Sequence, residues 1–399
     1  MKRAMSKAAC IGGFAAGLIG GNIADAQPAA QPWKQNATAS HGQSSDAFIN
    51  NILTTILSDV QQVRTTSTNT YINATGVPAY PIGPWPSNPN TPSNQNILAR
   101  FPRTPQAQTG THTNTGLGAI GLWIDGVEIF NAKDARSYQN KGYWNQNAVV
   151  VEGPSFDAAG GHPAPGGAYH HHQTPIGLRI VLGDSGAKHS PILGYAFDGF
   201  PIYGPYGFAN ADGSGGVVRM VSSYRARSIS TRTTLPNGTV LTSQNYGPAV
   251  SGTYPLGYYI EDFEFVSGLG HLDLYNGRFA VTPDFPAGIY AYFTTLDSSG
   301  ASAYPYVVGP QYYGVLNTDN TNHTVAVPAG ATPYCEADID GSGQIDDADF
   351  AIFAPAYNIL MCTDQAMPAG CYADLNHDGA VDDSDFVLFA AAYDALVCN

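Results

Sequence analysis

Apolar side chains near the C-terminus of the 399-residue chain recur at intervals of three and four residues, which places them on one face of a helix. The pattern occurs twice, over residues 350–360 and 386–396. We therefore expect two helices that pack against each other through these faces. The apolar positions are Phe350, Phe353, Tyr357 and Leu360 in the first helix, and Phe386, Phe389, Tyr393 and Leu396 in the second.

A helical spacing of apolar residues also covers residues 44–64, where either Ser45 or Asp46 is suited to cap the first turn. This pattern predicts one amphipathic helix within an N-terminal segment of residues 27–65. The apolar positions are Ala47, Phe48, Ile49, Ile52, Leu53, Ile56, Leu57 and Val60.

Between residues 66 and 316 the apolar residues come in short runs separated by Gly, Pro, Asn and Thr. Short strands joined by turns have this pattern, so we expect a mainly β domain. Asp125-Gly126 lies between two apolar triplets and is expected to form a hairpin turn. The apolar runs are residues 117–130, 178–182, 258–266 and 288–295.

The predicted fold class is therefore a multidomain protein, with a mainly β central domain at residues 66–316 and a small all-α domain at residues 335–399. Residues 317–334 are rich in Thr, Asn, Ala and Pro, which is typical of a flexible linker between domains.

The first residues have the pattern of a secretory signal peptide. Lys2, Arg3 and Lys7 precede an apolar run at residues 8–23, and Ala24-Asp25-Ala26 supplies the small residues of a cleavage site. We expect residues 1–26 to be removed and the mature protein to be secreted. No other segment approaches the roughly 20 uninterrupted apolar residues of a membrane span.

Charge and cysteine are concentrated in the same region. The formal net charge of −14 argues against nucleic acid as a partner, and residues 335–399 hold thirteen acidic residues with no Lys or Arg. Four of the five cysteines also lie there, which predicts two disulfides in an exported protein, with three pairings possible. These cysteines are Cys335, Cys362, Cys371 and Cys398.

Residues 335–399 contain a duplication, because a shift of 36 residues superposes Cys335 on Cys371 and Gly343 on Gly379. Each copy begins with a twelve-residue loop of alternating oxygen-bearing residues with Gly at position six, as a Ca²⁺ loop requires. We expect two bound Ca²⁺ ions. The expected ligands are Asp338, Asp340, Ser342, Gln344, Asp346 and Asp349 in the first loop, and Asp374, Asn376, Asp378, Ala380, Asp382 and Asp385 in the second, with Gln344 and Ala380 using backbone carbonyl groups.

A duplicated unit of one calcium loop and one helix resembles a dockerin, in the form that carries cysteines before each loop and after each helix. The resemblance implies antiparallel repeats in which disulfides join Cys335 to Cys398 and Cys362 to Cys371. It also implies a partner outside the cell, either a cohesin-like domain or a cell-surface scaffold.

Histidine is concentrated within residues 161–173, which hold four imidazoles. In a strand, His170 and His172 would lie on one face about 7 Å apart, close enough to share a metal ion, whereas His171 would point to the other face. His189, and His271 with Asp273, follow later in the chain.

These segments resemble the YHYH family of exported bacterial proteins. The resemblance rests on residues 161–172, 189–205 and 270–293, and it covers about residues 115–315. In the motif that names the family, His171 stands where the family has Tyr. The resemblance implies a shared fold but no defined activity.

Two interpretations of the histidines remain open. One is a site for Cu²⁺ or Zn²⁺, and the other is a hydrogen-bonded polar network that shapes a groove. We expect a binding role rather than catalysis. The candidate metal ligands are His162, His170, His172, His189, His271 and Asp273.

Two alternative functions also remain. Metal-dependent hydrolysis is one, because the run from His189 through Gly194 and Ala196 to Asp198 resembles in part the signature of zinc D-alanyl peptidases. Polysaccharide binding is the other, because the 24 tyrosines could supply aromatic platforms.

Overall fold

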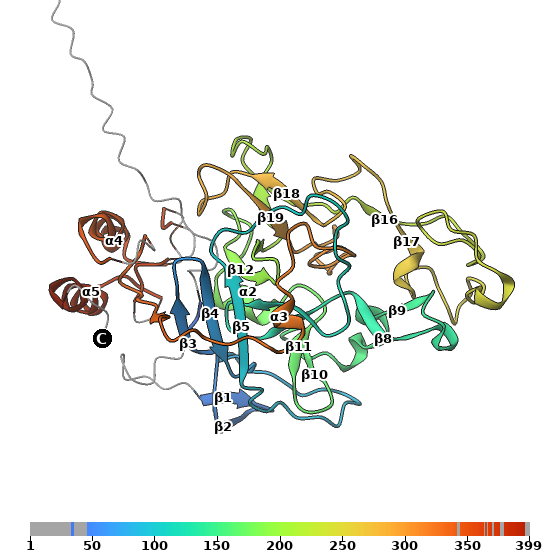
Figure 1. Ribbon diagram of the computed structural model, residues 1–399, viewed down its shortest axis with the longest axis horizontal. Helices are drawn as coiled ribbons and strands as arrows, with labels where there is room; N and C mark the ends of the chain where they lie inside the picture. Colours follow the sequence, from blue (N-terminus) through green and yellow to red (C-terminus); the bar gives the residue numbers. More distant parts are fainter. Residues whose placement is uncertain are drawn as a thin grey trace, which may run out of the picture.

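The computed structural model describes residues 33–35, 46–340, 344–362, 364, 366–368, 371–375 and 379–395 (Figure 1). Most of these residues form a β-rich domain, and helices α4 and α5 lie at one end of the molecule. The signal peptide expected at residues 1–26 lies outside the described residues. Across the described ranges, none of the helices has the length and apolar character that crossing a membrane requires.

An eight-stranded mixed sheet forms the centre of the domain, and this confirms the prediction of a mainly β central region. Strand β11 runs parallel to β7 and β13 runs parallel to β19, whereas the other neighbours are antiparallel. Trp123, Tyr195 and Phe293 are fully buried against it. In order across the sheet, the strands are β10 (His162–Pro163), β11 (Tyr169–His171), β7 (Glu128–Phe130), β6 (Ala119–Trp123), β12 (Ile192–Ala196), β13 (Pro201–Tyr203), β19 (Ile289–Phe293) and β18 (Gly277–Ala280).

A four-stranded antiparallel sheet shares the same apolar core. Its two longest pairings join β3 to β4 and β4 to β5. Ile72 and Phe101 are fully buried there. The strands, in order, are β20 (Thr332–Pro333), β3 (Val60–Thr65), β4 (Asn69–Ala74) and β5 (Ile97–Pro102).

The hairpin turn predicted at Asp125-Gly126 is confirmed between β6 and β7. Gly126 has a φ of 78°, and its N–H donates to the carbonyl of Trp123 at 2.9 Å. A Cβ atom at Gly126 would lie 2.4 Å from Cβ of Ala74, so both the backbone conformation and the neighbouring sheet require glycine.

The amphipathic helix predicted over residues 44–64 is wrong. The described part of this segment forms the hairpin of β1 (Asp46–Ile49) and β2 (Ile52–Leu57), followed by β3. Asn50 and Asn51 adopt φ values of 50° and 63°, which makes the two-residue turn that asparagine favours in hairpins. Ile52 and Leu53 are each 65% exposed, so the apolar spacing did not mark a buried helical face.

The apolar run at residues 178–182 is also not a strand. It lies mainly in the short helix α2 (Ile176–Val181), in which Leu178 is buried while Ile180 and Val181 are exposed. The remaining two-stranded sheets are β8 (Lys133–Ser137) with β9 (Asn145–Asn147), β14 (Tyr206–Phe208) with β15 (Val217–Arg219), and β16 (Tyr224–Ala226) with β17 (Phe263–Phe265). Short helical turns are α1 (Ala148–Val151), η1 (Tyr138–Asn140), η2 (Gly153–Ser155), η3 (Ser243–Asn245) and η4 (Ile260–Asp262).

The two helices predicted near the C-terminus are confirmed as α4 (Asp347–Ile359) and α5 (Asp383–Ala395). Phe353 and Phe389 stack at 4.9 Å and are buried in a core that is separate from that of the β domain. The side chain of Asp346 accepts a hydrogen bond from the N–H of Ala348 and caps α4. We refer to the described part of residues 335–395 as the C-terminal module.

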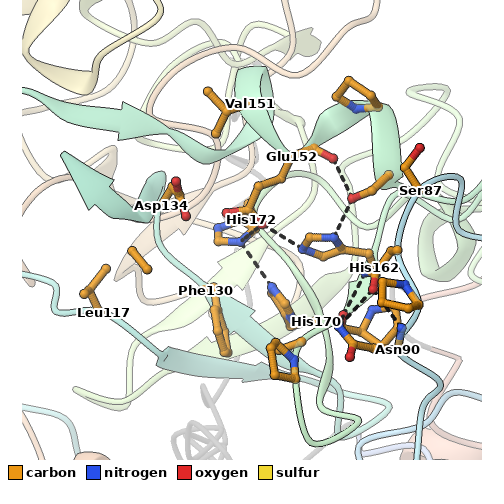
Figure 2. A pocket seen from close by; sticks show the side chains of 18 of the residues that line it. Ser87, Asn90, Leu117, Phe130, Asp134, Val151, Glu152, His162, His170 and His172 are labelled. Carbon is orange, nitrogen blue, oxygen red and sulfur yellow. Dashed lines mark hydrogen bonds and ion pairs between the residues drawn. The ribbon is translucent and has the colours of Figure 1, made fainter. Parts of the chain in front are cut away.

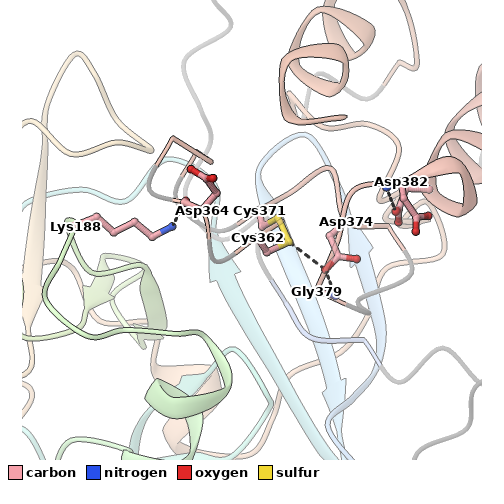
Figure 3. Close-up of a disulfide and its surroundings, with 8 residues drawn as sticks. Lys188, Cys362, Asp364, Cys371, Asp374, Gly379 and Asp382 are labelled. Carbon is pink, nitrogen blue, oxygen red and sulfur yellow. Dashed lines mark hydrogen bonds between the residues drawn. A yellow bond between two sulfur atoms is a disulfide. The ribbon is translucent and has the colours of Figure 1, made fainter. Parts of the chain in front are cut away.

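A disulfide joins Cys362 to Cys371, as predicted, and ties the end of α4 to the start of the second repeat (Figure 3). Cys335 is also disulfide-bonded. Its expected partner, Cys398, lies outside the described residues.

The segment expected to be a flexible linker is anchored at both ends. Near its start, helix α3 (Thr318–Thr321) presents Asn320, whose amide accepts from the N–H of Arg100 and donates to its carbonyl, each at 2.8 Å. Near its end, β20 adds to the edge of β3. Asparagine side chains that bond to a strand edge explain why this polar stretch is held against the domain.

Candidate metal centre

Three of the predicted histidines meet beside the edge of the large sheet (Figure 2). His162 on β10 pairs directly across the antiparallel hairpin with His170 on β11. His172 follows β11, two residues beyond His170, and therefore returns to the same face. His171 points the other way and is buried against Trp123 and Tyr169, as the alternation predicted.

The nitrogen atoms of these histidines converge with one carboxylate. Nε2 of His170 lies 3.1 Å from Nε2 of His172. Oε2 of Glu152 lies 2.9 Å from Nε2 of His162 and 3.6 Å from Nε2 of His172. The four residues each offer a ligand atom, and all four atoms lie within 4.8 Å of one another.

The opposite nitrogen of each imidazole is held by the protein. Nδ1 of His170 lies 3.0 Å from the carbonyl oxygen of Ala168, and Nδ1 of His172 lies 2.6 Å from that of Asn131. Because a carbonyl only accepts, both Nδ1 atoms carry the proton and both Nε2 atoms present a lone pair when the rings are neutral. Nδ1 of His162 is 2.8 Å from Oγ of Ser155.

Burial favours a neutral His170, and the neighbouring histidines favour an ionised Glu152. Burial, reinforced by His172 and His162, lowers the pKa of His170 well below its ordinary value. Burial alone would raise the pKa of Glu152, but hydrogen bonds from His162 and His172 outweigh it and hold that pKa well below the usual range. Burial and the adjacent Glu152 raise the pKa of Asp134 to about 6.

A cavity of about 510 Å³ opens directly onto the cluster, and Figure 2 shows the four donor residues along its wall. The loop at residues 86–90 and the turn at residues 163–165 form one side of the cavity. Leu117, Phe130 and Val151 contribute apolar surface. Phe130 also stacks on His170 with ring centroids 3.9 Å apart. A bound ion would therefore be reached through a partly apolar entrance.

Three other candidate ligands are engaged elsewhere. His189 is buried beside Tyr203 and Phe208, where burial lowers its pKa to about 4. Nδ1 of His271 accepts from the N–H of Val221 at 3.0 Å, on the exposed surface. Asp273 accepts from the N–H groups of a turn and from the hydroxyl of Tyr290. The structure therefore brings together His162, His170 and His172 but does not place these three residues with them.

Glu152, which supplies the carboxylate of the cluster, was not predicted from the sequence. It follows α1 directly and lies ten positions before His162, after three consecutive valines. The sequence offered one signal: Asp157 and Glu152 are the two acidic residues nearest to the histidine-rich segment on its N-terminal side. Asp157 is engaged instead with Trp85 and Tyr169.

In the C-terminal module, the first acidic loop brings three expected calcium ligands together. Carboxylate oxygens of Asp338, Asp340 and Asp349 lie within 4.8 Å of one another. Asp349 is fully buried and accepts from the N–H groups of Asp340 and Asp346, at 3.0 and 2.9 Å. Burial raises its pKa. Gln344 is described, whereas Ser342 lies outside the described residues.

The second loop is described in part, with Asp374, Ala380, Asp382 and Asp385 inside the described ranges and Asn376 and Asp378 outside them. Asp385 is fully buried and accepts from the N–H of Asp382 at 2.9 Å, which repeats the arrangement of the first loop. Asp374 also lies near the sulfur atoms of Cys362 and Cys371, but these sulfurs are in a disulfide and offer no thiolate to a metal.

The model of the family described as YHYH protein matches residues 98–304, just over half of the chain. The chain belongs to the YHYH family. The match contains Glu152 and the three clustered histidines, and it ends before the C-terminal module. No curated protein and no solved structure matches the chain. The function of the YHYH domain is therefore inferred from the geometry of its own residues.

Proposed function

We propose that the YHYH domain binds one divalent transition-metal ion through Nε2 of His162, His170 and His172 and the carboxylate of Glu152. The observation that carries the proposal is the approach of two Nε2 atoms, on His170 and His172, to 3.1 Å. Both rings donate from Nδ1 to carbonyl groups, so in the neutral state two lone pairs face each other. That arrangement needs a cation between them.

A proton is a weaker candidate for this cation than a metal ion. Burial and two neighbouring imidazoles disfavour a charged His170, whereas a metal ion would satisfy all four donors at once. An ion about 2.1 Å from each donor sets adjacent donors about 3.0 to 3.4 Å apart. The 3.1 Å between His170 and His172 falls within that range, whereas the 2.9 and 3.6 Å from Glu152 to His162 and His172 lie just outside it.

The donor set selects the class of metal. Imidazole nitrogen suits Cu²⁺ and Zn²⁺, whereas Ca²⁺ and Mg²⁺ prefer sites made of oxygen ligands. Each imidazole makes a hydrogen bond to the protein through Nδ1, the nitrogen that faces away from the proposed ion, as metal-binding histidines usually do. We therefore favour Cu²⁺ or Zn²⁺ in this site.

Metal analysis of the chelator-treated full chain tests the proposal. We expect uptake of about one Cu²⁺ or Zn²⁺ ion per chain, and loss of that uptake in a His170→Ala, His172→Ala double variant. His271→Ala is the matched control, because His271 lies outside the cluster, and it should bind as the wild type does. Equal metal content in the wild type and the double variant would refute the site.

We also propose that residues 335–399 form a dockerin-like module that binds two Ca²⁺ ions on a secreted protein. The meeting of Asp338, Asp340 and Asp349 supports the first site, and the equivalent hydrogen bonds made by Asp349 and Asp385 support the second. A cohesin-like domain or a surface scaffold is the proposed class of partner.

Calorimetric titration of the full chain with Ca²⁺ tests the two proposed calcium sites. We expect about two ions per wild-type chain and one fewer in Asp349→Ala, because position twelve closes the loop. Asp394→Ala, an exposed acid on α5, is the control and should bind two. If no heat of Ca²⁺ binding is detected at millimolar Ca²⁺, the proposed calcium-binding module is contradicted.

A further inference from the structure

The four proposed donors of the metal centre lie on the wall of the cavity, so an ion held by them would face the cavity. Glu152, His162, His170 and His172 all line the cavity. Hydrogen bonds at Nδ1 keep the imidazoles in place, so these rings cannot swing across to enclose the ion on the open side.

Three other polar residues that line the cavity, Asn88, Asn90 and Ser155, hydrogen-bond to protein groups. The Asn88 amide donates to the carbonyl of Pro163 at 2.9 Å, and the Asn90 amide donates to Oδ1 of Asn88 at 2.9 Å. Oγ of Ser155 donates to the backbone carbonyl of Glu152 at 2.7 Å. Asp134 lies beside Glu152, but among the described residues it is outside the group of four converging donors. A fifth ligand would therefore come from outside the protein.

The charge of the centre favours an anion as that ligand. Three neutral imidazoles and one carboxylate leave a divalent ion with a net positive charge on its four donors, and of the two other charged residues that line the cavity, Lys133 adds to this charge and Asp134 opposes it. The nearby walls are apolar at Leu117, Phe130, Val151 and Pro154. A cavity of about 510 Å³ falls within the size range of small-molecule sites.

We propose that the metal keeps an exchangeable coordination position facing the cavity, and that this position binds the anionic end of a small molecule whose apolar body lies along the cavity walls. This inference rests on the proposed metal site. It assigns the centre to ligand binding rather than to a purely structural role, because the exchangeable position is a fifth one, beyond the four protein donors, on the side that the cavity opens.

Anion titration of the Cu²⁺-loaded full chain tests the inference, once metal analysis has established that one ion is bound. Azide should produce a new charge-transfer absorption band that saturates. Benzoate and acetate, which carry the same carboxylate, should compete with azide, and benzoate should bind about tenfold more tightly because its ring buries apolar surface.

Leu117 provides a variant that separates the two parts of the inference, since it lines the cavity and is 57% exposed. Leu117→Ser should reduce the preference for benzoate about threefold without changing azide binding. Leu269→Ser, at an exposed leucine away from the cavity, should leave both unchanged.

The possible failures are distinguishable. Failure to bind a metal refutes the proposed function itself. A loaded metal whose spectrum azide does not alter overturns the open position while leaving the metal site intact. Azide binding with equal affinities for benzoate and acetate overturns the apolar part of the ligand.

Discussion

The hydroxyl of Tyr372 in the C-terminal module donates a hydrogen bond to the carboxylate of Asp284 in the YHYH domain. The other oxygen of that carboxylate accepts from the hydroxyl of Tyr203 at 2.8 Å. Asp284 thus joins a tyrosine of the sheet to a tyrosine of the second repeat of the C-terminal module. Burial raises the pKa of Asp284, and the hydrogen bonds from Tyr372 and Tyr203 oppose this by stabilising the ionised carboxylate.

Removal of the Tyr372 hydroxyl is predicted to weaken this contact. Tyr372→Phe should lower the free energy of unfolding by about 1.5 to 3 kcal/mol, because it removes a hydrogen bond to a carboxylate that has little water to replace it. Tyr357→Phe is the control, since the Tyr357 hydroxyl bonds to Asp383 on an exposed surface within the module. Urea unfolding measures both; equal losses would show that the contact between module and domain adds nothing.

Glu152 is predicted to be essential to the metal centre. Glu152→Gln keeps the shape of the side chain but removes its charge, and it should weaken Cu²⁺ or Zn²⁺ binding at least about tenfold. Glu264→Gln, at a half-buried residue that pairs with Arg225 outside the cluster, serves as the control. Competition with a metal chelator measures the affinities. An unchanged affinity in Glu152→Gln would remove Glu152 from the ligand set.

His171 is predicted to be dispensable for metal binding, although it lies between two ligands. Its side chain is fully buried on the opposite face of β11. His171→Tyr, which turns residues 169–172 into Tyr-His-Tyr-His, should retain about one metal ion per chain. His170→Ala should lose it. Loss of the metal in His171→Tyr with the fold intact would show that both faces of the strand contribute.

His189 is predicted to make the protein sensitive to acid. Its pKa of about 4 is below the ordinary value of about 6.5, so the unfolded chain takes up the proton first as the pH falls. Stability due to neutral His189 is present above about pH 6.5 and is lost as the pH falls towards about 4.

The test of His189 is His189→Phe, which replaces the imidazole with another ring in the same aromatic surroundings. Between about pH 7.5 and pH 4, the difference in unfolding free energy should move by about 3 kcal/mol in favour of the variant. Urea unfolding at several pH values, with metal-free protein, measures this difference. A difference that stays constant with pH would rule out His189 as the source.

The cluster of the candidate metal centre could be predicted from the sequence where its geometry is local. His170 and His172 lie two residues apart, so strand geometry alone places them together. His162 joins them through the β10–β11 hairpin, whose Pro- and Gly-rich turn was visible. Glu152 is positioned at the junction of α1 and η2. His189 lies instead among aromatic residues of the core. Such placements depend on long-range packing that spacing does not encode.

The same contrast applies to the fold. The duplicated stripes around Phe353 and Phe389 predicted two packed helices, because each stripe repeats over several turns. Residues 46–57 had helical spacing too, but Asn50 and Asn51 favour a left-handed turn that divides the segment into two strands. Local turn chemistry outweighed periodicity there.

The addition of β20 to the edge of β3 has a geometric consequence for anything that binds α4 and α5. Together with the Tyr372 contact, it fixes the module at two separate points, and Figure 1 places the helices at one end of the molecule. A scaffold that held those helices would therefore also fix the orientation of the YHYH domain, and with it the direction in which the cavity opens.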